Sequence, residues 1–236
     1  MISSNIGIIK ENIRLAAAKS GRRPDEVKLI CVTKNRSLKE ISEAIKGGIT
    51  DIGENKVQEA LVKYRQLTAN RYVLDTVKWH LIGHLQTNKA RDAVKVFDLI
   101  HSVDSIKVAE MIDKEAAKIG KIQDVLVEVN TSGESTKFGV APDELFNLAK
   151  GAEALNNVRL LGLMTMAPVV DDKEDARPYF KRLQQLKAGL DEFLLNAKSY
   201  PLTVLSMGMT QDYEVAVEEN ATMVRIGTAV FEETAN

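Results

Sequence analysis

One lysine and two turns rich in hydroxyl groups and glycine follow apolar runs of this sequence. Lys34 ends the apolar run 29–34, and the last two apolar runs lead into the segments 206–210 and 225–228. An unprotonated lysine amine attacks a carbonyl carbon. Hydroxyl groups and open backbone amides bind phosphate. Together these residue types predict one ligand, an aldehyde that carries a phosphate group.

The phosphate would lie against two turns that follow neighbouring strands. Their hydroxyl groups and glycines come from Ser206, Gly208, Thr210, Gly227 and Thr228. Thr210 is expected to be the N-cap of a helix over 211–219, whose free amides would face the anion. Two ordinary strand-to-helix turns are the alternative interpretation, because Gly, Ser and Thr favour turns in any case.

Two basic side chains should project from strand ends into the same space. Strand alternation puts Ile30, Val32 and Lys34 on one face, and Arg225 shares its face with Gly227. A solvated surface lysine is the alternative for Lys34. Arginine can only donate hydrogen bonds, so Arg225 would hold an unprotonated ring nitrogen of the ligand. Its alternative partner is a buried carboxylate, Glu128.

The remaining chemistry-bearing residues point away from a metal centre. His80, His84 and His101 fall on the expected third and fourth strands, without the carboxylates and close spacing that a metal site needs. No metal is expected, and His80 is predicted to be a hydrogen-bonded wall of the ligand pocket. Met164 and Met209 are expected to line the ligand, although methionines at these positions also suit a core.

Apolar runs alternate with helical patterns along the whole chain. Strands are expected at 27–34, 50–55, 78–84, 98–103, 124–130, 159–166, 203–207 and 223–228. Helices are expected at 37–46, 56–68, 86–95, 105–119, from a first turn that contains Pro142, at 176–197 and at 211–219. Strands joined by helices run parallel. The prediction is an α/β fold, a single (β/α)8 TIM-type barrel over residues 1–236 with an extra N-terminal helix over 2–20.

An open, doubly wound sheet is the rival fold, but the Gly-x-Gly-x-x-Gly run that typically follows its first strand is absent. The net charge of −1 in 236 residues gives no basic surface for nucleic acid or membrane. The single Cys31 cannot form an internal disulfide, and no apolar run approaches a membrane span. These features predict a cytoplasmic protein.

Six motifs in order resemble one family, the pyridoxal phosphate homeostasis proteins, which are relatives of the alanine racemase barrel. They lie at residues 32–34, 53–59, 79–89, 162–166, 206–210 and 224–228, within a match over about 5–231. The resemblance implies a barrel that binds pyridoxal 5′-phosphate (PLP) and acts in intracellular vitamin B6 homeostasis. The chain departs from the family pattern at three positions. Thr33 and Thr210 stand where the family commonly has serine, and Glu232 stands where a glycine often follows the final phenylalanine.

The resemblance also assigns roles to individual residues. It implies a Schiff base on Lys34, Arg225 at the pyridine nitrogen and Asn55 near the ring. It implies phosphate contacts from the turn that holds Ser206 and Thr210 and from Gly227 and Thr228. Lys137 matches a further lysine-bearing motif, whose role the resemblance leaves open.

Two functions are compatible with this resemblance. The first is a PLP carrier without turnover, a monomer that serves PLP-dependent apo-enzymes; the second is an amino-acid racemase of low activity. Racemisation needs proton-transfer groups on both faces of the substrate. The resembled racemases take their second base, a tyrosine, from a separate C-terminal domain. The tyrosines of this chain are expected in helices and loops, which favours the carrier: Tyr64, Tyr72, Tyr179, Tyr200 and Tyr213.

Overall fold

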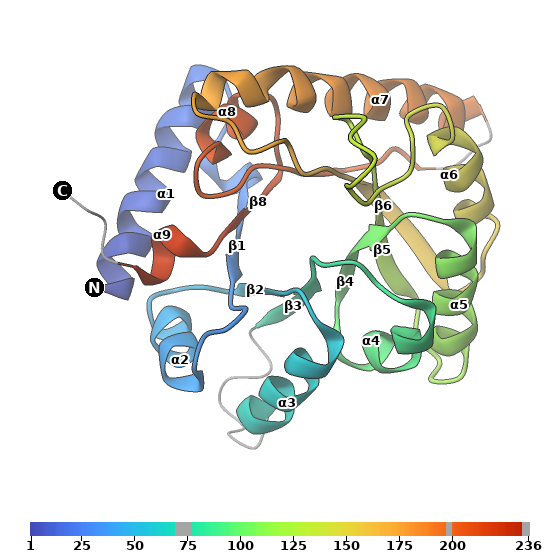
Figure 1. The fold of residues 1–236 in the computed structure, drawn as a ribbon, viewed down its shortest axis with the longest axis horizontal. Helices are drawn as coiled ribbons and strands as arrows, with labels where there is room; N and C mark the ends of the chain where they lie inside the picture. The colour runs from blue at the N-terminus through green and yellow to red at the C-terminus, as the bar shows by residue number, and fades with distance from the viewer. Residues whose placement is uncertain (69–76, 197–199, 233–236) are drawn as a thin grey trace.

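Eight parallel strands close into a barrel in the computed structural model, which describes residues 1–68, 77–196 and 200–232. The strands follow one another around the barrel in chain order, and β8 pairs with β1. The predicted barrel is therefore confirmed (Figure 1). The strands are β1 Lys28–Val32, β2 Asp51–Glu54, β3 Lys78–Leu81, β4 Leu99–Val103, β5 Gln123–Glu128, β6 Val158–Met164, β7 Val204–Ser206 and β8 Met223–Ile226.

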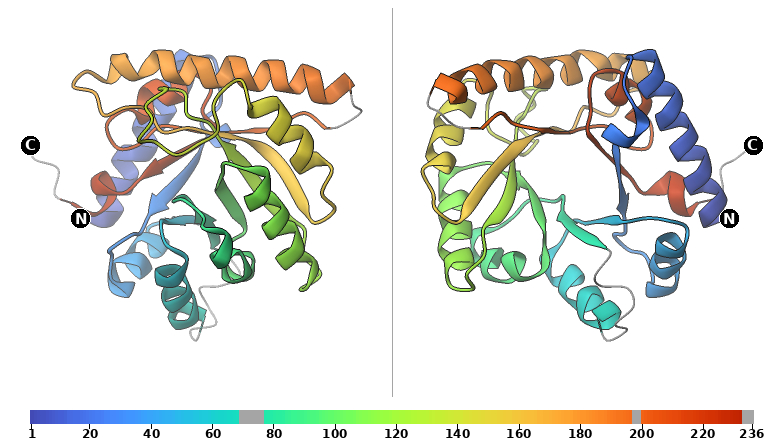
Figure 2. Two further views of the ribbon diagram at one scale, coloured as in Figure 1. Left: turned by 45° about the vertical axis from the view of Figure 1, so that its right-hand side comes forward. Right: turned by 180° about the vertical axis from the view of Figure 1, so that it is seen from behind.

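Helices form the outer layer, because each parallel strand needs a crossover to reach the next. Figure 2 shows them around the strands from two further sides. Within the described ranges, no helix combines the length and the apolar character needed to cross a membrane. The helices are α1 Ile2–Lys19, α2 Leu38–Lys46, α3 Val57–Thr68, α4 Ala90–Val96, α5 Ile106–Ala117, α6 Leu145–Glu153, α7 Arg177–Asn196, α8 Tyr213–Glu218 and α9 Thr228–Phe231, with 3-10 turns η1 Pro24–Glu26, η2 Thr87–Lys89 and η3 Lys173–Ala176.

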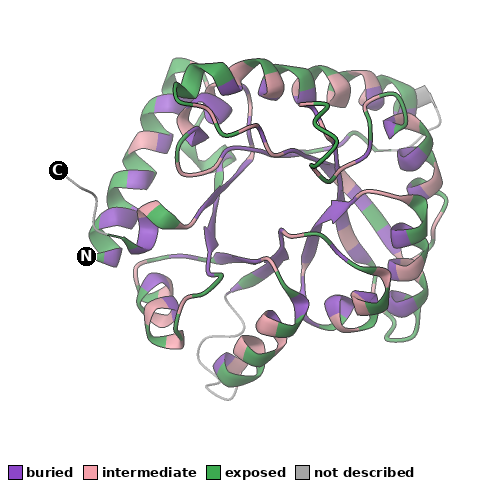
Figure 3. Cartoon of the chain, in the orientation of Figure 1, coloured by how far each residue is buried: buried purple, intermediate pink, exposed green. Residues whose placement is uncertain are grey.

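Two apolar layers hold the barrel together. Ile30, Leu126 and Met164 belong to a small cluster inside the strands, while a larger cluster fills the space between strands and helices. Figure 3 shows the strands buried almost throughout and the helices buried on one side only. Burial on both faces explains why the strands are continuous apolar runs.

The expected N-terminal helix is also present. Helix α1 packs against α2, α8 and α9 and covers the side of the barrel where β8 pairs with β1 (Figure 1). Its buried face carries isoleucines at helical spacing, such as Ile6 and Ile13. The Asn5 amide donates to the carbonyl oxygens of Val230 and Glu232, which ties α1 to the last turn of the chain.

Several expected boundaries are wrong, because the strands end before the residues that turn toward the helices. Strand β1 ends at Val32, so Lys34 lies in a turn beside Asn35, whose φ is 60°. Thr228 belongs to α9 rather than to the last strand. Helix α6 begins at Leu145, after Pro142 rather than around it. Residue 197, the expected end of the long helix, lies outside the described residues.

Candidate functional site

A cavity of about 300 Å³ opens over the C-terminal ends of β1, β7 and β8. Parallel barrels gather their functional loops at this end. The lining comes from the loops after β6, β7, β8 and β1, so the cavity lies to one side of the barrel axis. The lining residues come from four loops that are far apart in sequence: Val32, Lys34, Arg36, Pro168, Val169, Val170, Met209, Thr210, Gln211, Asp212, Arg225, Gly227 and Thr228.

Lys34 reaches this cavity from the turn that follows β1. Ile30 lies in the cluster inside the barrel, Val32 lines the cavity, and Lys34 lines it two residues later. Thr33 points the other way and is fully buried. The Lys34 side chain is exposed, so its amine is accessible to a ligand that enters from solvent.

A buried ion pair supports the turn that carries Lys34. Lys63 of α3 donates to Glu54 Oε1 and to the carbonyl oxygen of Thr33, both at 2.6 Å. The Thr33 hydroxyl donates to the same Glu54 oxygen at 2.6 Å. Glu54 is fully buried, and the Lys63 side chain is 13% exposed. Sequence reasoning missed Lys63, because a lysine on a helix gives no local sign that it turns inward.

The turn after β7 lines the cavity through Met209 and Thr210. The expectation that Thr210 caps the following helix is wrong, because α8 begins at Tyr213 and its N-cap is Asp212. Asp212 Oδ1 instead accepts a 2.6 Å hydrogen bond from the Met209 amide, which closes the turn. Burial raises the pKa of Asp212, opposed by this hydrogen bond and by the charge of Arg225.

Backbone conformation and packing explain why residue 208 is a glycine, without any contact with an anion. Its φ is 91°, and a Cβ there would stand 2.5 Å from the Ala216 Cβ. Replacing Gly208 by alanine should therefore lower the free energy of unfolding by roughly 2–4 kcal/mol, from a left-handed backbone plus overpacking. Chemical denaturation measures this, with Gly120→Ala as control because that glycine has a φ of 63° and open space around it. Equal costs for both variants would contradict the role of packing against α8.

Arg225 forms the buried floor of the cavity at 4% exposure. Its Nη1 donates to Ser206 Oγ at 2.7 Å, and its Nη2 donates to the carbonyl oxygen of Thr165 at 2.9 Å. Burial lowers the pKa of Arg225 to about 10, opposed by the charges of Glu128 and Asp212. The guanidinium therefore stays charged at neutral pH. The alternative ion pair with Glu128 is not formed within the described part of the chain, where Arg225 bonds to neutral groups.

Glu128 shares the interior with Arg225 and is 2% exposed. Burial raises the pKa of Glu128 to about 7, Arg225 opposes that rise and Asp104 adds to it. Folding thus strengthens proton binding, so this group stabilises the protein at low pH and the stabilisation is lost as pH rises toward 7.

We expect Glu128→Gln to remove that loss. Relative to the variant, the wild-type free energy of unfolding should fall by about 2–3 kcal/mol between about pH 5 and pH 8. Urea unfolding across this range measures the difference, and the exposed Glu144→Gln variant should follow the wild-type curve. Parallel curves for the wild type and Glu128→Gln would show that Glu128 does not titrate in this range.

Five of the other candidate residues lie away from the cavity lining. Ser206 is fully buried, and its hydroxyl contacts His101 and Arg225 inside the barrel. His80 is buried on β3, which is separated by β2 from the nearest cavity-lining strand, β1. Met164 belongs to the cluster inside the barrel. Asn55 is half-buried beside Gly83 at the ends of β2 and β3. These four residues were expected to contact the ligand, but the cavity lies to one side of the barrel axis and does not reach them. Gly208, the fifth, packs against α8.

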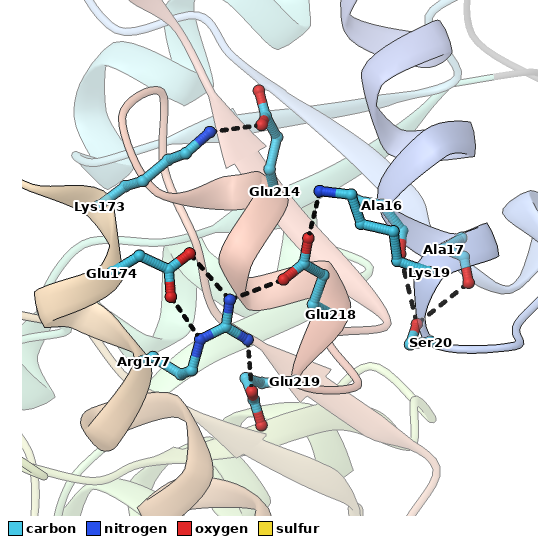
Figure 4. A network of polar contacts seen from close by, with 10 residues as sticks. All are labelled: Ala16, Ala17, Lys19, Ser20, Lys173, Glu174, Arg177, Glu214, Glu218 and Glu219. Atoms are coloured by element: carbon cyan, nitrogen blue, oxygen red, sulfur yellow. Dashed lines mark hydrogen bonds and ion pairs between the residues drawn. The ribbon is translucent and has the colours of Figure 1, made fainter.

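Ion pairs tie η3 and the start of α7, which follow the cavity-lining segment 168–170, to α8. Arg177, at the start of α7, bonds to Glu174, Glu218 and Glu219 at 2.6–2.9 Å (Figure 4). Lys173 bonds to Glu214 in the same network. The hydrogen bonds that Arg177 donates to these carboxylates raise its pKa. The segment 168–170 therefore leads into a part of the chain that is bonded to α8, and α8 follows the Met209 turn.

Lys137 lies outside the cavity lining. Its Nζ stands 3.1 Å from Glu134 Oε1, in a loop where Phe138 stacks on His84 with ring centroids 4.3 Å apart. Within residues 1–68, 77–196 and 200–232, no three His, Cys, Asp or Glu side chains gather in a way that could hold a metal ion.

The sequence matches the family described as "Alanine racemase, N-terminal domain" over residues 5–234. A pyridoxal phosphate homeostasis protein of Aquifex aeolicus is 44% identical over 225 residues, with 95% of each chain covered. The protein of that name from Vibrio alginolyticus is 39% identical over 230 residues, which cover 98% of this chain and 96% of the relative.

Solved structures agree with these sequence matches. PipY of Synechococcus elongatus, solved with PLP bound, superposes with a TM-score of 0.81 at 36% identity and covers 98% of this chain and 100% of its own. An alanine racemase of Clostridium difficile has a TM-score of 0.70 at 15% identity; it covers all of this chain and 57% of its own, and it shares the fold. The chain belongs to the pyridoxal phosphate homeostasis protein family within the alanine racemase N-terminal fold.

Proposed function

We propose that this protein binds PLP at the cavity, holds it covalently on Lys34 and acts in PLP homeostasis without catalytic turnover. One observation carries the proposal. The same cavity is lined by Lys34 and by the two late turns, the second of which contains Arg225. Both turns are distant from Lys34 in sequence. The relatives named as homeostasis proteins, and PipY solved with PLP bound, support the same function.

The lining offers a suitable partner for each of three parts of PLP: the ring nitrogen, the phosphate and the aldehyde. The Arg225 guanidinium only donates hydrogen bonds, so it suits an unprotonated pyridine nitrogen. Thr210 and Thr228 bring hydroxyl groups, and Met209 and Gly227 bring backbone, to the side where a phosphate would bind. Lys34 supplies the amine at the rim. PLP itself would supply an aldehyde that combines with an amine and a pyridine ring that can withdraw electrons from a bound amino acid.

Lys34 has one chemical task in this proposal. Its unprotonated Nζ adds to the aldehyde carbon, and the carbonyl oxygen leaves as water, so that a Schiff base joins the two. Because the side chain is exposed, water can reverse the bond and release PLP intact. Release to PLP-dependent apo-enzymes follows from this reversibility. The position of Lys34 at an open rim therefore suits storage and delivery.

The cavity lining contains few groups that could transfer protons in the racemisation of an amino acid. Asp212 is the one carboxylate among the described lining residues, and its Oδ1 is bonded to the Met209 amide. No tyrosine belongs to this lining; Tyr72 lies outside the described residues. An arginine at the ring nitrogen also keeps that nitrogen unprotonated, which weakens electron withdrawal by the ring.

The decisive experiment titrates the purified protein with PLP, reduces the mixture with borohydride and maps the modified peptide. We expect one PLP per chain on Lys34. Loaded protein is then incubated with alanine in deuterated water, and exchange of the α-proton at the rate of free PLP supports the carrier. Modification at another lysine would overturn the assignment, and sustained exchange with many turnovers would establish a racemase.

A further inference from the structure

A chain of buried hydrogen bonds crosses the barrel interior from the floor of the cavity to the opposite end. Arg225 Nη1 bonds to Ser206 Oγ, which contacts His101 Nδ1 at 2.9 Å. His101 Nε2 contacts His80 Nδ1 at 2.9 Å, and His80 Nε2 contacts Asp51 Oδ1 at 2.9 Å. The members are at most 4% exposed. The chain therefore lies almost entirely inside the protein.

The two ends of this chain lie at opposite mouths of the barrel. Asp51 is the first residue of β2, so it stands at the N-terminal end of the strands, with Lys28 Nζ 3.3 Å from Oδ1. Arg225 lines the cavity at the other end. The step from His101 to Ser206 joins β4 to β7, which are not neighbours in the sheet. The chain is thus a bridge through the interior rather than a ladder along one strand pair.

The chemistry of the groups fixes the direction of every bond. Burial would raise the pKa of Asp51, but hydrogen bonds from His80 and Thr50 outweigh it and lower the pKa. Asp51 is therefore a carboxylate that only accepts, so His80 Nε2 carries a hydrogen. At the other end, Arg225 only donates, so Ser206 Oγ accepts and must place its own hydrogen elsewhere.

Among the described residues, the acceptor for the Ser206 hydroxyl is His101 Nδ1. His101 then carries its hydrogen on Nε2 and donates it to His80 Nδ1. Burial, His80 and Arg225 lower the pKa of His101 well below its ordinary value, in agreement with a neutral ring. Each group donates toward Asp51, which leaves no buried donor or acceptor of the chain unmatched.

We propose that Asp51, His80, His101 and Ser206 are positioning residues that hold the Arg225 guanidinium toward the cavity through this one-directional chain. The inference deepens the proposed function, on which its ligand-dependent part rests. Hydrogen bonds in series polarise one another, so the negative charge of Asp51 strengthens the bond that Ser206 accepts from Arg225. Arg225 is thus oriented without an adjacent carboxylate, which would compete with the ligand for its donors.

The first test needs no ligand. Nitrogen-15 NMR of the histidine rings in the free protein should show hydrogen on Nε2 and a bare Nδ1 for both His80 and His101. The Arg225 guanidinium should show slow rotation and slow hydrogen exchange. A charged ring or hydrogen on Nδ1 of either histidine would overturn the proposal, whether or not the protein binds PLP.

The second test compares Asp51→Asn with Thr50→Val. The Thr50 hydroxyl donates to Asp51 Oδ2, so the control removes a bond to the same carboxylate and leaves His80 bound. Asp51→Asn should speed guanidinium exchange, shift the absorption of the loaded protein and weaken PLP binding roughly threefold to tenfold. Thr50→Val should stay within about twofold of the wild type.

Equal behaviour of the two variants would refute the positioning role. If Asp51→Asn does not fold, Ser206→Ala tests the same link at the other end and should speed exchange of Arg225. Wild-type protein that takes up no PLP, yet shows the expected tautomers and a rigid Arg225, would refute the proposed function and leave the chain intact.

Discussion

Replacing Lys34 by alanine should abolish covalent uptake of PLP while the fold remains. The side chain is exposed and the rest of the cavity lining is unchanged, so the barrel loses no buried contact. The variant should stay colourless after gel filtration and carry no PLP after borohydride reduction. Its apparent Kd should rise by roughly two orders of magnitude, the equivalent of about 3 kcal/mol.

Two lysines serve as controls for this experiment. Lys39→Ala removes an exposed amine from α2, and Lys137→Ala removes the lysine whose motif the sequence leaves without a role. Both should retain the wild-type absorption spectrum and the reduced adduct on Lys34. Full retention of the adduct spectrum by Lys34→Ala, or its loss in Lys137→Ala, would move the covalent site away from Lys34.

Replacing Lys63 by methionine should produce the largest loss of stability. The change leaves the Glu54 carboxylate fully buried without its cation, and Glu54 Oε2 already has no hydrogen-bond partner among the described residues. Removing one partner of a buried pair costs about 3–5 kcal/mol. Urea unfolding measures the cost, and Lys56→Met is the matched control because its pair with Glu59 is exposed and should contribute little to stability.

The double variant Lys63→Met with Glu54→Gln separates this effect from lost packing. The introduced glutamine side chain would be neutral and could still accept from the Thr33 hydroxyl, so the double variant should be more stable than Lys63→Met alone. The Thr33 carbonyl loses its bond to Lys63 in both variants. We therefore expect weaker PLP retention in both. A Lys63→Met protein as stable as Lys56→Met would show that water, rather than Lys63, compensates Glu54.

Local patterns were enough to predict the barrel and the rim of the site. Continuous apolar runs separated by helical periods require parallel strands, and parallel strands place all their C-terminal ends together. Lys34, Thr210, Arg225 and Gly227 could therefore be assigned to one end of the barrel from spacing alone. The observed cavity brings these residues together.

The buried contacts beneath the cavity could not be predicted in the same way. The contact of His101 with Ser206 spans 105 positions and joins strands on opposite sides of the barrel. Such a contact depends on barrel closure and on strand register, neither of which leaves a local signal. The same holds for Lys63, which turns inward from a helix, and for the cap of α8, which is Asp212 rather than Thr210.

Residue types and their periodicity thus establish which strand side chains face inward and which strand ends carry chemistry, because both follow from backbone geometry that repeats along the strands. They do not establish which inward-facing groups meet. Ser206 was expected to contact a phosphate, and the folded chain pairs its hydroxyl with His101 and Arg225 instead. Closure of the barrel makes that choice, since a buried hydroxyl must find its partners within the interior.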